Sequence, residues 1–367
     1  MKIALRNRQK GIALIIVMVV IIVISVIAAG FAYSMKVEMT LARNSNNDAD
    51  LEWLGRSGIE LARYVLALQT REPNANNFES LNQKWAGGPM ATNEDLINVE
   101  MTNHELGDGV FSVKITDLER KFNINLADQT VFQQAMTVMG VEATEAGAIS
   151  DAVLDWRDLD DDPHLNGAES DYYTSLPVPY LAKNGPIDEI TELLMIKGIT
   201  PEIFWGPGKT NEWDRMAAQS TAGGPQAIPD VTAATNSFGM VDLFETLGSG
   251  RININTAPAG VMQLIPGLTP TMALAVIQHR AGIDGMDGTE DDMPFRSVNE
   301  LSAVAGFGGA GGGAGTAQLS RYFDVRSHTF KVEVDAEVRG TKRHFVGIVR
   351  RNPRALNDFL VVKFYWE

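Results

Sequence analysis

Residues 12–35 read IALIIVMVVIIVISVIAAGFAYSM, a run of 24 residues without a charged side chain. About 20 apolar residues are enough for a helix to cross the hydrocarbon core of a bilayer. The segment before this run carries Lys2, Arg6, Arg8 and Lys10 and no acidic residue, and such a basic segment stays on the cytoplasmic side of a membrane. The sequence therefore predicts a membrane-spanning helix over 12–35, with the rest of the chain on the outer side.

The start of this helix predicts a processing site. No convincing small-residue signal-peptidase site follows the apolar run before Lys36. Lys10-Gly11-Ile12 instead resembles the site of prepilin peptidase, which cuts after a glycine and leaves the hydrophobic helix at the new N-terminus. The resemblance implies a leader over 1–11, a mature chain that begins at Ile12, and methylation as the accompanying modification. A plain single-span anchor is the alternative.

The fifth mature position separates this chain from most pilins and pseudopilins. Those proteins carry a glutamate there, which is thought to neutralise the terminal amine of the adjacent subunit, whereas this chain has Ile16. A carboxylate inside the bilayer is costly unless it has a partner. The absence of this carboxylate indicates a subunit that need not contact a neighbour above it, as expected at the tip of a filament.

The bulk composition limits the class of protein. A chain of 367 residues with 45% hydrophobic residues can form two or three domains with packed cores. Its net charge is −15, and removal of the basic leader would make it −19, which disfavours nucleic acid and anionic lipid surfaces as partners. The absence of cysteine excludes disulfides and thiolate metal sites. The leader therefore has to indicate the compartment: a single pass through the inner membrane, with the globular part in the periplasm.

Both ends of the chain predict one α/β domain. Apolar residues recur on one helical face up to Leu68, and no proline occurs before Pro73, so the first helix continues well beyond the membrane. After a loop at 70–93, alternating patterns predict strands over 97–101, 110–116, 329–338, 343–349 and 359–366. Because a lone hairpin is marginal, we predict an α+β fold: a pilin-like domain over 36–119 and 320–367, in which a long helix packs on an antiparallel sheet. A large helical domain over 120–319 is inserted into it.

The inserted domain contains an internal repeat. FNINLA at 122–127 parallels ININTA at 252–257, and IDEITEL at 187–193 parallels FRSVNEL at 295–301. Each copy has an apolar helix pattern, a glycine-containing break, a second helix and then an acidic loop, which predicts two helix-hairpin-helix-like units over about 120–205 and 251–310. The linker over about 206–237 and the glycine-rich stretch at 306–315 are expected to be flexible.

The acidic loop of the first unit has the spacing of a cation site. In DLDDDPHLNGAE at 158–169, oxygen-bearing side chains fall at the first, third, fifth, ninth and twelfth places, as in an EF-hand calcium loop. The sixth place, where that loop requires glycine, is a proline, so the turn must be made differently. The predicted Ca²⁺ ligands are Asp158, Asp160, Asp162, Asn166 and Glu169, with Asp171 as an additional candidate. A solvated loop without metal is the alternative.

The corresponding loop of the second unit does not follow the twelve-residue spacing. Its prediction as a second calcium site depends on carboxylate density and on its place in the repeat. The candidate ligands there are Asp284, Asp287, Asp291 and Asp292.

Catalysis and nucleic-acid binding have little support in the sequence. The five histidines lack the spacing of a zinc site, and Ser57 lacks the spacing of a nucleophile elbow. The segment 261–280 resembles a helix-hairpin-helix, but Thr269 replaces its second glycine and no cluster of Lys or Arg adjoins it. We therefore predict neither an enzyme nor a nucleic-acid-binding protein.

The whole chain resembles the K-type minor pseudopilin of the type II secretion system, also called general secretion pathway protein K. The resemblance depends on the leader, the missing glutamate at Ile16, the two Asn-Ile-Asn starts, DWRD at 155–158, and NGAE at 166–169 followed by two tyrosines. It implies a pilin-like fold interrupted by a helical insertion that binds calcium.

The resemblance also implies a function in protein secretion and transport across the outer membrane. A protein of this family caps the tip of the pseudopilus together with the I and J minor pseudopilins, and helps to start its assembly. Prepilin peptidase, the inner membrane and secreted substrates are the other expected partners. A minor pilin of a type IV pilus or competence pseudopilus is the nearest alternative, and a membrane-anchored DNA receptor is a more distant one.

Overall fold

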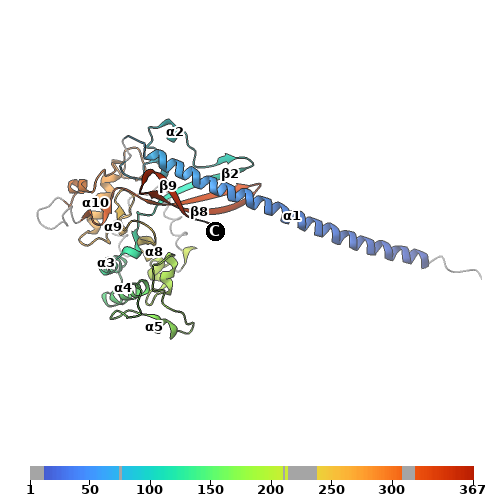
Figure 1. Ribbon diagram of the computed structural model, residues 1–367, viewed down its shortest axis with the longest axis horizontal. Helices are drawn as coiled ribbons and strands as arrows, with labels where there is room; N and C mark the ends of the chain where they lie inside the picture. Colours follow the sequence, from blue (N-terminus) through green and yellow to red (C-terminus); the bar gives the residue numbers. More distant parts are fainter. Residues whose placement is uncertain (1–11, 74–76, 210, 214–237, 308–318) are drawn as a thin grey trace, which may run out of the picture.

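The computed structural model describes residues 12–73, 77–209, 211–213, 238–307 and 319–367. One long helix, α1 (Ile12–Gln69), extends away from a head that contains a five-stranded antiparallel sheet and a group of short helices (Figure 1). This arrangement confirms the predicted α+β, pilin-like fold. The predicted leader with Gly11, most of the predicted linker at 206–237 and most of the glycine-rich stretch at 306–315 lie outside the described residues.

The two halves of α1 lie in different surroundings. Its first half, residues 12–42, is exposed, and the helix is long and apolar enough to cross a membrane, with a mean hydropathy of 3.5 in its most apolar part. Its second half packs on the sheet through buried residues that include Leu51, Leu54, Ile59, Ala62 and Val65. Their spacing of three to five residues keeps them on one face of the helix, because an α-helix turns every 3.6 residues.

The sheet is built from both ends of the chain, as predicted. Its strand order is β1-β2-β7-β8-β9 and every neighbouring pair is antiparallel. In β7, Phe330, Val332 and Val334 alternate with more exposed residues, so one face of the strand is buried against α1. The turn between β7 and β8 has positive φ at Arg339 and Gly340, as a two-residue type I′ hairpin requires. The strands are β1 (His104–Leu106), β2 (Gly109–Asp117), β7 (Thr329–Val338), β8 (Thr341–Asn352) and β9 (Ala355–Trp366).

The predicted strand over 97–101 is wrong. A short helix, α2 (Glu94–Ile97), ends at the start of this range, and no strand follows it over the described residues 98–103 before β1. The Asn93 side chain caps the start of α2 by accepting a hydrogen bond from the Asp95 N–H at 2.9 Å. Two acidic residues in its first turn add favourable interactions with the helix dipole. The first strand of the hairpin is β1, which lies further along the chain. The predicted turn at Gly107 is confirmed, with φ of +61°.

The inserted region consists mainly of short helices. Two parallel strand pairs that the sequence did not predict, β3 with β4 and β5 with β6, join distant parts of this region. A single 3-10 turn, η1 (Lys84–Ala86), precedes it in the pilin-like domain. The inserted elements are β3 (Phe122–Asn123), η2 (Ile124–Leu126), α3 (Gln129–Met139), α4 (Ala143–Arg157), α5 (Ser170–Thr174), η3 (Ile190–Met195), α6 (Pro201–Trp205), α8 (Met240–Leu243), β4 (Phe244–Glu245), β5 (Ile252–Asn253), α9 (Ala259–Met262), α10 (Pro270–Arg280) and η4 (Val298–Ala303). The partner of β5, β6 (Phe323–Asp324), lies just beyond the predicted end of the insertion.

The Asn-Ile-Asn starts make the same contacts in both units. Asn125 exchanges two hydrogen bonds with the backbone of Ile187, at 2.9 and 2.8 Å, and Asn255 does the same with the backbone of Phe295. Each asparagine therefore joins the start of its unit to the segment that follows the acidic loop. The internal repeat is a repeat of structure as well as of sequence.

Arginines at the ends of corresponding helices form a second shared feature. Arg157, the last residue of α4, donates hydrogen bonds to the carbonyl oxygens of Ile124 and Ala127. Arg280, the last residue of α10, donates in the same way to those of Ile254 and Ala257. The acidic loop of the first unit begins immediately after this arginine, and the first acid of the second loop, Asp284, follows within one short turn of the chain. Both loops therefore start from a helix end that is fixed to the Asn-Ile-Asn segment.

Two hydrophobic cores divide the head. One core contains α1 and the sheet, and the other contains the inserted helices. The second core also includes Phe78, from the loop after α1, and Val325, just beyond the predicted end of the insertion. Figure 1 shows α4 and α5 at the end of the inserted region that lies farthest from the sheet.

Candidate metal-binding site

The first acidic loop begins at the C-terminal end of α4. Asp155 is in the last turn of this helix, and Asp158 is its C-cap residue. Residues three apart lie on the same face of a helix, so these two carboxylates point toward the same side. Arg157 between them turns to the carbonyl oxygens at the start of the unit. The helix end therefore carries two acidic groups into the loop.

Three of the predicted ligands come together. Asp158, Asp160 and Glu169 each place one carboxylate oxygen within 4.8 Å of the others. A second group with the same limit contains Asp155, Asp158 and His164, so Asp158 belongs to both. Carboxylate oxygens at such separations can coordinate one hard cation such as Ca²⁺.

Glu169 is the residue that most needs a cation. Its side chain is only 4% exposed, and within the described part of the chain neither of its carboxylate oxygens has a hydrogen-bond partner. Burial raises the pKa of Glu169 to about 7, and the neighbouring charges of Asp155 and Asp158 act in the same direction. A buried carboxylate without a partner is costly, and a bound cation would remove that cost.

The pKa of Asp158 changes in the same sense. Burial raises it, and the charges of Asp160 and Asp155 raise it further. One of the oxygens of Asp158 is also buried without a hydrogen-bond partner in the described residues. The cluster thus combines like charges with unpaired oxygens, which is the donor set that a divalent cation requires.

Two other predicted ligands of this loop, Asp162 and Asp171, lie outside the group. Asp162 and Asp171 are exposed, and the backbone N–H of Asp162 donates to Asp160 at 3.1 Å. Asn166 is also exposed, and its backbone carbonyl oxygen accepts a hydrogen bond from the Lys197 ammonium at 3.2 Å. The role of its side-chain oxygen as a ligand stays a prediction. The EF-hand spacing therefore predicted the correct loop. In the structure, the carboxylates that come together are those at the start of the loop and at its end.

Sequence reasoning missed Asp155 as a site residue. Its carboxylate accepts hydrogen bonds from the backbone N–H groups of His164 at 3.1 Å and Ala168 at 2.6 Å, and it contacts the His164 ring. A Cβ atom at Gly167 would overlap the Asp155 carboxylate. The signal was present in the DWRD and NGAE sequences, because Asp155 is one helical turn before Asp158 and Gly167 leaves room for it.

The second acidic loop uses its carboxylates differently. Asp287 forms a two-point ion pair with Arg280, at 2.7 and 2.9 Å. Asp291 accepts hydrogen bonds from the backbone of Ile283 and Asp284, and these bonds lower its pKa. Within the described loop, none of the four predicted ligands there joins a group of three acids that could hold a metal.

The remaining two predicted ligands of the second loop are also paired with backbone. Asp284 accepts from the N–H of Met286 at 2.8 Å, and Asp292 accepts from that of Gly288 at 2.8 Å. These side chains stabilise tight turns of the loop. A second calcium site stays a prediction.

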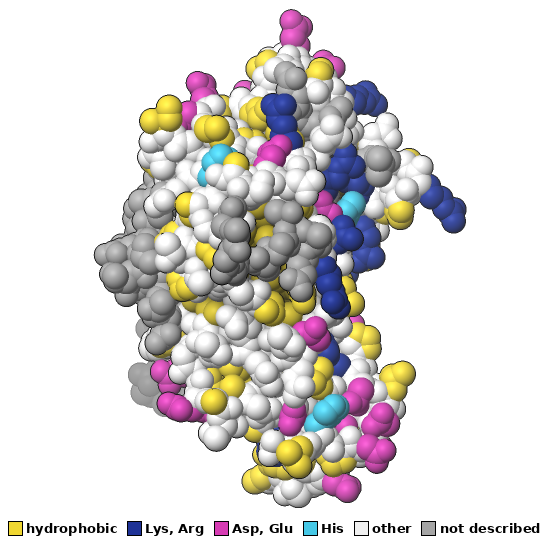
Figure 2. All heavy atoms as spheres, turned by 90° about the vertical axis from the view of Figure 1, so that its left-hand side faces the viewer, with side chains coloured by type: hydrophobic (Ala, Val, Ile, Leu, Met, Phe, Trp, Pro, Cys, Tyr) yellow, Lys and Arg dark blue, Asp and Glu magenta, His cyan; other side chains and the backbone are white. Residues whose placement is uncertain are grey.

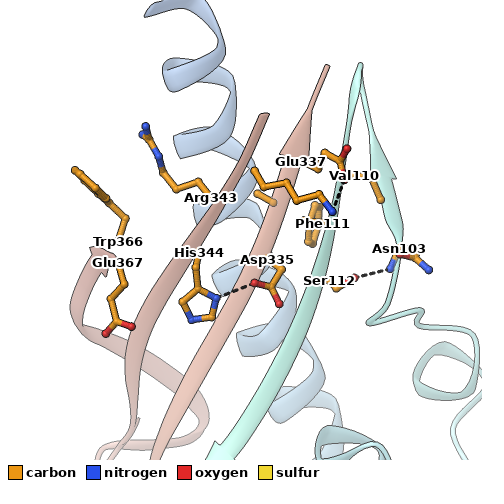
Figure 3. A pocket seen from close by; sticks show the side chains of 12 residues that line it. Asn103, Val110, Phe111, Ser112, Asp335, Glu337, Arg343, His344, Trp366 and Glu367 are labelled. Carbon is orange, nitrogen blue, oxygen red and sulfur yellow. Dashed lines mark hydrogen bonds and ion pairs between the residues drawn. The ribbon is translucent and has the colours of Figure 1, made fainter. Parts of the chain in front are cut away.

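A cavity of about 680 Å³ lies on the sheet and brings serine, histidine and aspartate near one another (Figure 3). The His344 ring contacts Asp335 at 2.8 Å, on the neighbouring strand. Ser112, however, accepts a hydrogen bond from the Asn103 N–H at 2.9 Å and is not paired with the histidine. Because nucleophilic catalysis requires that the base contact the nucleophile, this arrangement is not a catalytic triad.

Models of a known protein family match the sequence of the inserted region. Two family models, both described as type II secretion system protein K, match residues 113–205 and 252–326. These ranges correspond to the two predicted units of the insertion.

Curated relatives named type II secretion system protein K share sequence with the chain over about half of its length. The protein from Pectobacterium carotovorum subsp. carotovorum is 27% identical over 221 residues, which cover 54% of this chain and 61% of the relative. The protein from Pseudomonas aeruginosa is 26% identical over 207 residues, which cover 53% of this chain and 59% of the relative. The chain thus spans about three fifths of the length of the relatives that it matches.

A solved structure supports the fold. It is a chain of the GspK-GspI-GspJ complex from the enterotoxigenic Escherichia coli type 2 secretion system, with a TM-score of 0.61 and 19% sequence identity. The match covers 89% of this chain and 99% of that chain.

Proposed function

From its membership of the type II secretion system protein K family, we propose that this chain is a non-enzymatic minor pseudopilin that caps the pseudopilus. The long α1 helix supports this assignment, because half of it is exposed and apolar and half packs on the pilin-like head. The observation that carries the tip position is Ile16, an exposed apolar residue on the membrane half of α1. A helix without a carboxylate there makes no charge contact with a subunit above it.

The large insertion gives a mechanical reason for the same position. The inserted units add a second core beside the pilin-like domain, so the head is much broader than its helix (Figure 1). A subunit with such a head can begin or top a filament and cannot easily be covered by another subunit. We propose I-type and J-type minor pseudopilins as its neighbours, because the similar solved chain is in a complex with GspI and GspJ.

The proposed topology follows from the N-terminal charges. Prepilin peptidase would cut between Gly11 and Ile12 at the cytoplasmic face, and α1 would then anchor the chain in the inner membrane with its head in the periplasm. Substitution of Gly11 by a larger residue should leave the chain at its precursor mass. Mass spectrometry of the membrane-extracted protein measures this directly, and a normally processed Gly11 variant would contradict the proposed site.

Secretion and filament position test the main proposal. Deletion of the chain should abolish secretion by the type II system, and a tagged chain should label one end of the pseudopilus by immunoelectron microscopy. Labelling along the whole filament would contradict a tip role. Loss of pilus functions with intact secretion would support the type IV pilus alternative instead.

We further propose that the first acidic loop holds one Ca²⁺ ion between Asp158, Asp160 and Glu169, with Asp155 adjacent. The unpartnered buried Glu169 carboxylate supports this site. The ion would offset much of the negative charge of the cluster and fix the two ends of the loop to each other. At a calcium concentration 100 times the Kd, binding would stabilise the folded chain by about 2.7 kcal/mol.

Thermal melting of the full chain in detergent, with calcium and with chelator, tests this site. Calcium should raise the Tm of the wild type and should have no effect on the double variant Asp160→Asn/Glu169→Gln. The matched control Asp162→Asn/Asp171→Asn removes two exposed acids of the same region and should keep the response. An equal response in all three proteins would contradict the site, and a stoichiometry of two would support a second site at 284–292.

A further inference from the structure

Two leucines of the first acidic loop point away from the protein. Leu159 is 86% exposed and Leu165 is 95% exposed, although both are large apolar residues. They belong to the lobe of α4 and α5, where Figure 2 shows hydrophobic side chains next to acidic ones at the lower end of the molecule. Their chain neighbours Asp158 and His164 have side-chain atoms within 4.8 Å of each other, so the two leucines belong to the same part of the surface. Exposed apolar groups that share one part of a surface commonly mark a site of interaction.

The position of Leu159 follows from the geometry of the carboxylate cluster. Leu159 lies between Asp158 and Asp160, whose carboxylates both turn toward Glu169. The chain bends at residues 158–160, and the high exposure of Leu159 shows that it is directed away from the two inward carboxylates. The arrangement that brings the Asp158 and Asp160 carboxylates to Glu169 therefore also leaves the Leu159 side chain exposed to solvent.

The backbone beside both leucines is held by the rest of the lobe. The Asn184 amide donates to the carbonyl oxygen of Asp160 at 2.8 Å, next to Leu159. The Lys197 ammonium donates to the carbonyl oxygens of Asn166 and Gly167 at 3.2 and 2.9 Å, next to Leu165. These leucines are therefore part of a supported surface.

Further acidic residues lie close to the two leucines in the chain, even after the cluster is set aside. Asp161, Asp162 and Asp171 are exposed and do not belong to the group that could hold a metal. Of the basic side chains nearby, Lys197 is engaged by backbone carbonyl oxygens and lies over the ring of Tyr172, and the His164 ring contacts the Asp155 carboxylate. The surface thus offers apolar side chains with a negative rim, and its charge complement is a partner with apolar side chains and a positive rim.

We propose that Leu159 and Leu165 form a docking surface for a protein segment that carries apolar side chains flanked by lysine or arginine. Docking is stronger with calcium present, a dependence that rests on the proposed calcium site, because the ion fixes the loop that presents Leu159. Anionic membrane lipid is disfavoured as the occupant by the three acids of the rim. The surface lies away from α1, the element that we assign to anchoring.

Peptide binding to the full chain in detergent tests the proposal. The probes are two synthetic amphipathic helical peptides with identical leucine positions, one with lysines and the other with glutamates on its polar face. Fluorescence anisotropy should show tighter binding of the lysine peptide, and the double variant Leu159→Ser/Leu165→Ser should weaken that binding at least tenfold. The control Ile283→Ser removes a residue that is 96% exposed in the second acidic loop and should leave binding unchanged.

Several outcomes would overturn the proposal. Equal weakening by Ile283→Ser would show general stickiness of exposed apolar residues, and equal binding of the glutamate peptide would remove the charge argument. Binding of phosphatidylglycerol vesicles that depends on the two leucines would assign the surface to a membrane instead.

The leucine variant also separates this proposal from the calcium site. It retains the carboxylates, so calcium should still raise its Tm. Calcium stabilisation without peptide binding by the wild type would overturn docking alone. Peptide binding that is equal with calcium and with chelator would leave the surface in place and would contradict its dependence on the metal.

Discussion

At the scale of residues, the acidic loop depends on close contacts that no single position reveals. Asp155 accepts the backbone N–H of Ala168 at 2.6 Å, and Gly167 lies where a larger residue would meet the same carboxylate. Glycine is needed here because of the space available, since its φ is not in the positive range. The turn that brings Glu169 to Asp158 therefore requires both the acid of α4 and the missing side chain of Gly167.

Gly167→Ala should destabilise the folded chain by about 1–3 kcal/mol, because the added methyl group forces Asp155 or the loop to move. Chemical denaturation of the full chain in detergent measures the loss. The matched control is Gly147→Ala, in the middle of α4 with no atom within 4 Å of the added carbon, which should stabilise by about 0.5–1 kcal/mol. Equal effects of the two substitutions would contradict the steric account.

At the scale of elements, α1 approaches the sheet through two glycines. A Cβ atom at Gly55 would lie 2.6 Å from the Phe345 ring, and one at Gly58 would lie 2.5 Å from a methyl group of Val334. Glycine inside a helix is normally unfavourable. At these two positions it allows the helix to approach the sheet more closely than any residue with a Cβ atom would. The distance between α1 and the sheet is set by these positions.

Gly58→Ala should lower the free energy of unfolding of the head by about 1–3 kcal/mol, because the helix must move away from β7. Gly30→Ala, in the membrane half of α1 with nothing within 4 Å, is the control and should not change the stability of the head. Urea denaturation followed by near-UV circular dichroism reports on the sheet domain. A stabilising effect of Gly58→Ala would show that the helix and sheet do not approach each other this closely.

At the scale of the whole molecule, buried acids join the two domains. Asp117, at the end of β2, accepts hydrogen bonds from Thr256 of the insertion and from Ser327, both at 2.6 Å. Glu119 accepts from the backbone N–H groups of Thr329 and Ser249, at 2.9 and 3.1 Å. Both acids therefore bind the sheet domain to the second inserted unit.

A third buried acid completes this junction. Glu79, from the loop after α1, accepts the Ser327 N–H at 2.9 Å and pairs with Arg351 of β8. Arg120 is half-buried, and the charge of Asp117 acts on its guanidinium. Two domains with separate cores are thus connected through a polar network in which each carboxylate has several donors, and such networks fix one relative arrangement.

The junction should make stability depend on pH. Burial raises the pKa of Glu79 to about 7 and that of Glu119 to about 8, from an ordinary value of 4.5. Above pH 4.5 the folded chain binds more protons at these sites than the unfolded chain. The contribution of these two groups to stability is therefore fully present below pH 4.5 and is lost as pH rises through 7 and 8. The slope would be at most about 1.4 kcal/mol per pH unit for each group.

Urea denaturation of the full chain in detergent between pH 5 and pH 8 tests this dependence. Glu119→Gln should flatten the decline, because the group no longer titrates, whereas the exposed residue in Glu290→Gln should leave the curve unchanged. An unchanged slope in Glu119→Gln would show that this carboxyl is ionised in the folded chain throughout the range.

The sequence by itself determined the parts that depend on local patterns. The uncharged run at 12–35 and the helical periodicity after it predicted α1, and alternation with turn residues predicted β2, β7, β8 and β9. The acidic loop was also recognisable, because Asp158, Asp160 and Glu169 share one short segment. Periodicity and turn chemistry act between near neighbours in the chain, and this is why they could be read directly.

Only the tertiary structure decided which distant groups meet. The pairing of β5 with β6 joins residues some 70 positions apart, and the junction joins Asp117 to Thr256. Asp287 was predicted to be a metal ligand because carboxylates are dense in its loop, but in the structure its partner is the Arg280 guanidinium. Charge and spacing say that a carboxylate needs a partner, but whether that partner is a cation, an arginine or a backbone N–H depends on how the loop folds back on its helix.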